Sequence, residues 1–236
     1  MIDSAAIRTR LADVRARIER AAGRARRDPA SVRLVAVSKT FPADAVRAAV
    51  DAGQLDFGEN KVQEALQKIE QTSDLPVRWH LVGHLQSNKT KKVGRFDMIH
   101  SVDDAALAAK VDEAARAAGR RIELLVQVDL ARETTKHGAA EDALPAIFDA
   151  ARAAQAAPLV GLMLLPPAVD DPDAARPYFR ELRAVRERLL AHGVDAFMLR
   201  ELSMGMSHDF EVAVEEGSTL VRVGTAIFGG RSYVRP

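Results

Sequence analysis

Lys39 closes the apolar run from Leu34 to Ser38, and its type and place suggest chemistry more clearly than those of any other residue. A lysine amine at the mouth of a buried strand is partly desolvated, which favours its neutral, nucleophilic form. Such an amine can form a Schiff base with an aldehyde. Because most lysines at strand ends are simply solvated, this hypothesis depends on the residues that gather around Lys39.

Polar residues also follow the later strand-like runs of the chain. They are Glu59 with Asn60, His84, the segment from Ser203 to Ser207, and Gly224 with Thr225. The segment Ser203-Met204-Gly205-Met206-Ser207 offers small residues and hydroxyls, which let backbone N–H groups approach phosphate oxygens. A short helix expected over 209–216 would add N–H groups at its start. Serine and glycine clusters are also common turns, so the phosphate and turn interpretations stay balanced at this point.

Arg222 stands between Val221 and Val223 in the last strand-like run. In a strand its side chain therefore faces opposite to both valines. Directed into the mouth, it would be a fixed cation that pairs with phosphate or donates a hydrogen bond to a ring nitrogen. The alternative is an arginine whose stem packs on the protein while its head reaches solvent.

Other common chemistries find no support in the sequence. It contains neither a G-x-G-x-x-G segment after a strand-like run nor a G-x-x-x-x-G-K-[ST] phosphate loop. His80 and His84 lie on a strand-like run without a carboxylate close by in sequence, and there is no H-E-x-x-H segment, so we expect no metal site. The chain has no cysteine, which excludes disulfides, thiolate metal sites and cysteine nucleophiles.

The elements that must position these residues alternate along the whole chain. Strand-like runs are expected over 32–38, 55–59, 77–83, 98–102, 122–130, 159–165, 201–206 and 220–228. Helix-like stretches follow most of them, at 44–50, 62–69, 105–118, 139–154 and 172–192. Such alternation indicates an α/β fold with parallel strands and right-handed crossovers. Two architectures fit this pattern, a closed (β/α)8 barrel of the TIM type and an open doubly wound sheet. The number of strands, their even spacing and the chain length favour the barrel. In such a barrel the active site lies at the C-terminal ends of the strands.

The first thirty residues and the composition limit the remaining possibilities. Ile7, Leu11, Val14 and Ile18 recur at helical spacing, so residues 1–30 should carry an extra helix packed on one barrel domain spanning 1–236.

Apolar residues make up 47% of the 236 residues, charged residues 28%, and the net charge is +1. These values are typical of a globular protein in water and do not favour nucleic acid as the main partner. No apolar run is long enough to span a membrane, and we expect a cytoplasmic protein.

The motifs together resemble those of the pyridoxal phosphate homeostasis protein family, also called the YggS or proline-synthase co-transcribed group. The resemblance runs in order from about Leu34 to Gly229, nearly the whole chain. It rests on the segments Ala36-Val37-Ser38-Lys39-Thr40, Phe57-Gly58-Glu59-Asn60, Trp79-His80-Leu81-Val82-Gly83-His84-Leu85-Gln86-Ser87-Asn88-Lys89, Leu202-Ser203-Met204-Gly205-Met206-Ser207 and Val221-Arg222-Val223-Gly224-Thr225-Ala226-Ile227-Phe228-Gly229.

This resemblance implies a barrel like the N-terminal domain of alanine racemase, with pyridoxal 5′-phosphate held as a lysine aldimine. The family's Schiff-base lysine falls on Lys39 and its mouth arginine on Arg222. The other cofactor-binding positions implied are Asn60, His84, Ser203, Ser207, Gly224 and Thr225. The resemblance also implies a role in vitamin B6 homeostasis, in which the protein buffers the cofactor or delivers it to apo-enzymes.

Carrier and enzyme are separate hypotheses. A racemase on this barrel needs proton transfer on both faces of the cofactor, and its relatives supply a tyrosine from a second domain. We expect no such domain after the last run, and neither Tyr178 in a helix nor Tyr233 in the tail is well placed. A non-catalytic carrier, monomeric or weakly dimeric, is therefore favoured. A slow amino-acid racemase and a phosphate-binding barrel with a structural Lys39 remain the alternatives.

Overall fold

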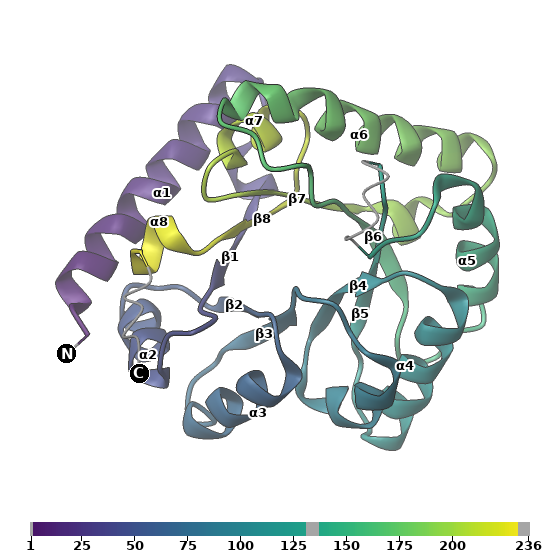
Figure 1. The fold of residues 1–236 in the computed structure, drawn as a ribbon, viewed down its shortest axis with the longest axis horizontal. Coiled ribbons are helices and arrows are strands. Elements are labelled where there is room, and N and C mark those ends of the chain that lie inside the picture. Colours follow the sequence, from purple (N-terminus) through teal and green to yellow (C-terminus); the bar gives the residue numbers. More distant parts are fainter. Residues whose placement is uncertain (1, 131–136, 231–236) are drawn as a thin grey trace.

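A computed structural model, which describes residues 2–130 and 137–230, shows a closed barrel of parallel strands (Figure 1). Each strand pairs with the next along the chain, and β8 pairs back with β1. The strands are β1 Arg33–Val37, β2 Asp56–Glu59, β3 Arg78–Leu81, β4 Met98–Val102, β5 Glu123–Gln127, β6 Leu159–Met163, β7 Glu201–Met206 and β8 Leu220–Val223. The prediction of a (β/α)8 barrel, rather than an open sheet, is therefore confirmed.

Helices surround the barrel (Figure 1). They are α2 Ala43–Asp51, α3 Val62–Gln71, α4 Ala105–Ala117, α5 Leu144–Ala151, α6 Arg176–Ala191, α7 Phe210–Glu215 and α8 Thr225–Phe228. Short 3-10 helices are η1 Pro29–Ser31, η2 Ser87–Arg95, η3 Glu141–Ala143, η4 Pro172–Ala175 and η5 Ala196–Leu199. The crossover from β3 to β4 thus runs through η2, a helix that we did not predict from the sequence.

The last strand is shorter than the sequence predicts. Apolar residues make up most of the run 220–228, but β8 ends at Val223 and the chain turns into α8, where the N–H of Phe228 donates to the carbonyl of Gly224 over 2.9 Å. Ile227 and Phe228 are buried on this helix instead of in a strand. A short apolar run has no period of its own, so it fits a strand and a buried helical turn equally well.

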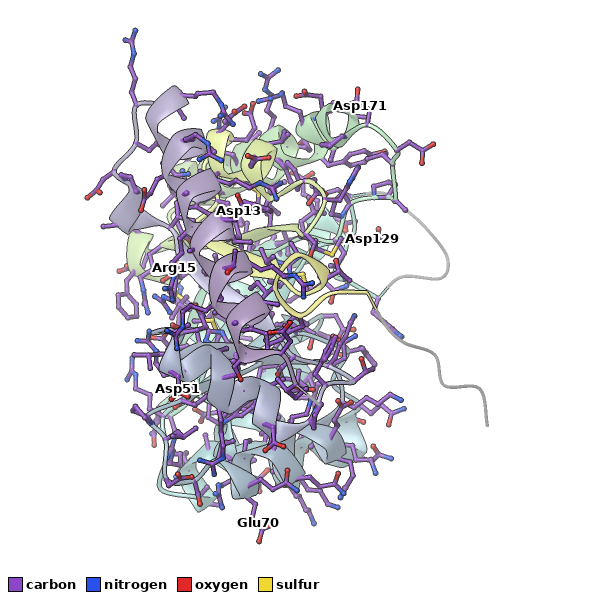
Figure 2. The ribbon with its side chains drawn as sticks, turned by 90° about the vertical axis from the view of Figure 1, so that its left-hand side faces the viewer. Asp13, Arg15, Asp51, Glu70, Asp129 and Asp171 are labelled. Carbon is purple, nitrogen blue, oxygen red and sulfur yellow. The ribbon has the colours of Figure 1, made fainter. Side chains whose placement is uncertain are left out.

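The N-terminal helix α1 (Ser4–Arg24) lies across the outside of the barrel and packs on α2, α7 and α8. Asp3 begins it by accepting a hydrogen bond from the N–H of Ala6 at 2.9 Å, which satisfies an otherwise unpaired N–H. Its apolar stripe, Ile7, Leu11, Val14 and Ile18, is buried as the spacing predicts. Figure 2 looks onto this helix; Arg15 on it donates to the carbonyl of Ala52 after α2 over 2.9 Å.

Two cores hold the barrel together. The larger core lies between the strands and the surrounding helices. The smaller core fills the inside of the barrel with the apolar residues Val35, Met98, Leu125, Val160, Met163 and Leu220. Strand alternation also sends polar side chains inward, so His80, His100, Ser203 and Arg222 are buried there as well. The barrel interior is therefore partly polar, and its polar residues lead toward the mouth.

No helix in residues 2–130 and 137–230 is both long and apolar enough to cross a lipid bilayer.

Candidate functional site

A pocket of about 630 Å³ opens at the C-terminal ends of the strands, within the size range of small-molecule sites. Its lining includes most of the residues that the sequence singled out, namely Lys39, Asn60, His84, Ser207, Arg222, Gly224 and Thr225. These residues come from the ends of β1, β2, β3, β7 and β8. The barrel thus gathers residues that lie as much as 186 positions apart (225 − 39) in the sequence.

Ser203 is placed differently. It lies in the middle of β7, is fully buried and pairs in register with Leu220, two residues deeper in the barrel than Arg222. Its hydroxyl contacts Arg222 from below and is absent from the pocket lining. The Ser203–Ser207 segment therefore divides between two roles, because strand alternation and depth separate its first serine from its last.

On one side of the pocket, charged residues fix the backbone around Lys39. Lys39 follows β1 in a turn and is half-buried. Before it, Ser38 donates its hydroxyl hydrogen to Glu59 at 2.6 Å, while the Lys68 ammonium donates to the Ser38 carbonyl at 2.8 Å. After it, the N–H of Thr40 donates to Glu64 at 2.6 Å. We call Ser38, Thr40, Glu59, Glu64 and Lys68, together with Lys39, the lysine side.

Thr40 has a φ of +70°, a conformation that is costly for a β-branched residue. Its hydrogen bond to Glu64 holds that conformation. Backbone strain of this kind persists only where surrounding contacts over-determine it, and it concentrates at functional sites. Here it sets the direction in which the chain leaves β1 immediately after Lys39.

Lys68 joins the two carboxylates of the lysine side. Its ammonium lies 2.6 Å from Glu59 and 2.9 Å from Glu64, and both Lys68 and Glu59 are buried. Burial raises the pKa of Glu59, and the nearby ammonium offsets this only in part. Burial also opposes ionisation of Glu64, but the hydrogen bonds from Lys68 and Thr40 outweigh it and lower the pKa of that carboxyl.

Gly83 lets the ends of β2 and β3 approach each other closely at the pocket wall. A Cβ at this position would lie 2.3 Å from the carbonyl oxygen of Asn60, far inside normal contact. Both residues line the pocket. A side chain on residue 83 would therefore displace Asn60 from the wall.

At the floor of the pocket, on the strand next to β1, the guanidinium of Arg222 is held by two hydrogen bonds. One terminal nitrogen, Nη1, donates to the Ser203 hydroxyl at 2.5 Å, and the other, Nη2, donates to the carbonyl of Leu164 at 2.8 Å. Burial lowers the pKa of Arg222 to about 10, which leaves the group charged at neutral pH. The side chain faces the barrel interior, as its place between two valines allowed, and it lines the pocket floor.

The loops after β7 and β8 meet at a third part of the pocket. The hydroxyl of Ser207 accepts from the N–H of Gly224 at 3.0 Å and, more weakly, from that of Ala226 at 3.4 Å. Asp209 stabilises the first loop by accepting from the N–H of Met206 at 2.6 Å. Backbone N–H groups and a hydroxyl thus converge at the place where barrels commonly bind phosphate.

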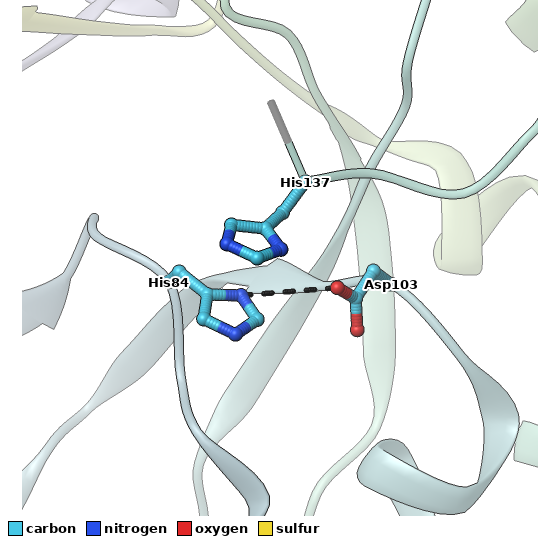
Figure 3. A group of neighbouring side chains, drawn as sticks. All are labelled: His84, Asp103 and His137. Carbon is cyan, nitrogen blue, oxygen red and sulfur yellow. Dashed lines mark ion pairs between the residues drawn. The ribbon is translucent and has the colours of Figure 1, made fainter. Parts of the chain in front are cut away.

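His84, Asp103 and His137 form a cluster at the pocket rim (Figure 3). The two imidazole rings stack with centroids 3.6 Å apart and an angle of 11° between their planes, and His84 Nδ1 lies 3.8 Å from Asp103. Burial, with a further contribution from His137, lowers the pKa of His84, which favours the neutral form that stacking needs. The ring nitrogens lie in two nearly parallel planes, so both could face one metal ion only after a ring turned.

Sequence reasoning missed several of these residues. It rejected a metal site at His84 because no carboxylate is close in sequence, yet the barrel brings Asp103 and His137 beside it. Gln127 and His208 also line the pocket. For Glu64 and Lys68 the available sequence signal was their spacing, four residues apart on a helix, which suits an ion pair.

Comparisons with known proteins agree with this geometry. Residues 3–232 match the sequence model of the alanine racemase N-terminal domain. A pyridoxal phosphate homeostasis protein of Pseudomonas aeruginosa is 44% identical over 96% of this chain and 96% of its own length. One from Aquifex aeolicus is 41% identical over 95% of this chain and 98% of its own length.

The chain belongs to the pyridoxal phosphate homeostasis protein family. This family member is also similar to the solved structure of PipY from Synechococcus elongatus with PLP bound, at 41% identity and a TM-score of 0.83. That match covers 94% of this chain and all of the PipY chain. The resemblance that the sequence motifs suggested is thereby confirmed.

Proposed function

We propose that this protein binds pyridoxal 5′-phosphate through a Schiff base to Lys39 and buffers the cofactor or delivers it to other proteins. The observation that carries the proposal is that Lys39, Arg222 and the Ser207–Gly224 contact all line the same pocket. The names of its relatives and the PLP-bound PipY structure support the choice of cofactor. Each side of the pocket matches one part of that molecule.

Lys39 supplies the amine for the aldehyde. It is half-buried, and the backbone on both sides of it is held by Glu64 and Lys68. The fixed backbone limits where the amine can go. Asn60 and His84 border the same part of the pocket and would contact the ring.

The loops after β7 and β8 suit the phosphate. The N–H groups of Gly224 and Ala226 already meet an oxygen, that of Ser207, so the geometry for accepting an anionic oxygen exists. Thr225 adds a hydroxyl at the same rim. This rim lies beside the end of β1, since β8 pairs with β1, so the phosphate would sit next to the strand that carries Lys39.

Arg222 on the floor would face the ring nitrogen. A guanidinium donates hydrogen bonds and cannot accept the ring proton, so it would leave the cofactor a weak electron sink. A carboxylate at this place would make the ring a strong one. The arginine therefore favours holding the cofactor over catalysing carbanion chemistry, and a carrier rather than a racemase is the function we infer.

A Schiff base also suits release. An incoming amine can exchange for Lys39 in the imine and take the cofactor away without net chemistry. We propose that the protein does this in the cytoplasm as a monomer or weak dimer, with transient contacts to apo-enzymes that use the cofactor. The absence of cysteine is consistent with a reducing compartment.

The spectrum of the protein mixed with pyridoxal 5′-phosphate tests the binding step. We expect an imine absorbance band in the wild type that is lost in Lys39→Ala and kept in Lys61→Ala, a matched change of a nearby lysine. Borohydride should fix the cofactor on the peptide that contains Lys39. A wild type without the band, or Lys39→Ala with an unchanged band, would contradict the proposal.

The carrier role needs a second measurement. Loaded protein is mixed with an apo-enzyme, and the rate of enzyme activation is compared with the rate of cofactor release into a small-molecule trap. Activation faster than release indicates delivery, and equal rates indicate buffering. Racemisation of an amino acid at ordinary enzymatic rates, lost in Lys39→Ala, would show an enzyme instead.

A further inference from the structure

A buried hydrogen-bond chain runs through the barrel from its N-terminal end to the Ser203–Arg222 contact. Asp56 at the start of β2 lies 3.1 Å from His80 Nε2, and His80 Nδ1 lies 2.9 Å from His100 Nε2. His100 Nδ1 lies 2.9 Å from the Ser203 hydroxyl, which contacts Arg222. All five residues are buried.

One direction of hydrogen bonding gives every donor in this chain an acceptor. Arg222 has no acceptor atom, so it donates to the Ser203 oxygen. The Ser203 hydrogen then needs an acceptor, and among the described residues its other partner is His100 Nδ1. That assignment makes His100 Nε2 a donor to His80 Nδ1, and His80 Nε2 a donor to Asp56. Both imidazoles are therefore neutral with the hydrogen on Nε2.

The electrostatics of the two ends agree with this direction. Full burial is the largest cause that holds the pKa of His100 well below its usual range, and the nearby cations Arg222 and Arg33 act in the same direction. Burial opposes ionisation of Asp56, but the hydrogen bonds from His80 and Arg78 outweigh it and lower the pKa of that carboxyl. A doubly protonated His80 would reverse the chain and leave the buried Ser203 hydrogen without its acceptor.

We propose that Asp56, His80, His100 and Ser203 position Arg222 as a fixed hydrogen-bond donor on the pocket floor, through a one-way chain that begins at the opposite end of the barrel. The chain turns Ser203 into an acceptor that always faces Arg222. With Nη1 and Nη2 each holding one partner, the guanidinium cannot rotate, and its remaining N–H groups keep one direction. That these groups meet the cofactor rests on the proposed function.

The direction of the chain is tested first, without any ligand. In histidine-labelled wild-type protein at neutral pH, nitrogen NMR should show both His80 and His100 as neutral rings with the hydrogen on Nε2. The Nε–H of Arg222 should exchange slowly with solvent. An imidazolium or an Nδ1–H ring at either histidine would overturn the proposal. This outcome does not depend on whether pyridoxal 5′-phosphate binds.

The positioning role is tested with His80, which is absent from the pocket lining. His80→Leu removes both hydrogen bonds, whereas His80→Gln keeps one acceptor and one donor and allows the same direction. We expect His80→Leu to speed exchange of the Arg222 Nε–H and to weaken binding of pyridoxine 5′-phosphate, which lacks the aldehyde, by about tenfold. His80→Gln should recover most of both effects.

Equal exchange rates and equal affinities in the wild type and both variants would overturn the positioning role. Because pyridoxine 5′-phosphate cannot react with Lys39, this comparison reports on the floor of the pocket alone. If the wild type binds neither pyridoxal 5′-phosphate nor pyridoxine 5′-phosphate, the proposed function fails. The exchange rates of the Arg222 Nε–H in the three proteins still decide whether the hydrogen-bond chain holds Arg222.

Discussion

The two sides of the pocket hold their central residues in opposite ways. On the lysine side, Lys68 and Glu64 bind the backbone before and after Lys39, and Glu59 binds the Ser38 hydroxyl. On the arginine side, which we define as Arg222 with Ser203, His100, His80 and Asp56, the contacts end on the guanidinium itself. The first side uses ion pairs and the second uses neutral rings between two charged ends.

This difference matches what each residue would have to do. A side chain that forms and breaks a bond must be able to turn, so the protein anchors its backbone. A side chain that only donates hydrogen bonds works best when it cannot turn, so the protein anchors its head. The comparison predicts that changes on the lysine side act mainly on stability, whereas changes on the arginine side act mainly on the ligand.

The largest effect is expected from Lys68→Met. It leaves Glu59 buried without its cation, which should lower the free energy of unfolding by about 3–5 kcal/mol in urea titrations. The double variant Glu59→Gln with Lys68→Met should be less destabilised than the sum of its single variants, because the unpaired charge is gone. Additive effects would show that the ion pair does not act as a unit.

A smaller loss is expected from Ser203→Ala on the arginine side. The change leaves a guanidinium N–H and His100 Nδ1 without their partner, at a cost of about 1–3 kcal/mol in the free energy of unfolding. Ligand affinity should fall as well. If Ser203→Ala lowers stability as much as Lys68→Met does and leaves affinity unchanged, the contrast between the two sides disappears.

The arginine side should also respond to acid. His100 stays neutral in the fold, while an unfolded histidine takes up a proton below its usual pKa of about 6.5. Stability should therefore fall as the pH drops below that value, by at most about 1.4 kcal/mol per pH unit from this residue. Urea titrations between pH 7 and pH 5 should show a shallower slope for His100→Gln; parallel slopes would contradict the assignment.

The smallest effect tests the strain at Thr40. Glycine adopts a positive φ freely and alanine does not, so Thr40→Gly should be more stable than Thr40→Ala by about 1 kcal/mol. At most positions the alanine variant is the more stable of the two, so the expected order is reversed here. An alanine variant as stable as the glycine variant would show that Glu64 does not hold a strained backbone beside Lys39.

The sequence predicted the fold and the mouth well because both depend on local patterns. Two expected strands, 98–102 and 201–206, match β4 and β7 to the residue. Lys39 and Arg222 could be singled out because each breaks an apolar run. The loss of 224–228 from the last strand and the presence of η2 depend on tertiary packing, which short apolar or polar runs do not record.

The contacts that orient the pocket residues could not be predicted from the sequence, for a different reason. Glu59 with Lys68, His80 with His100, and His84 with Asp103 are pairs whose members sit on different elements. Nothing in the spacing of such residues indicates that a barrel will place them side by side. Residues that carry chemistry are visible in a sequence more readily than the residues that orient them.

The pairing of β1 with β8 has one more consequence, for the time at which the site can form. Lys39 is made on the ribosome well before Arg222, Gly224 and Thr225. The ring of strands cannot close before β8 is available, so a chain that lacks β8 carries Lys39 without the rest of the pocket. A complete pocket is thereby reserved for chains in which β8 has been made.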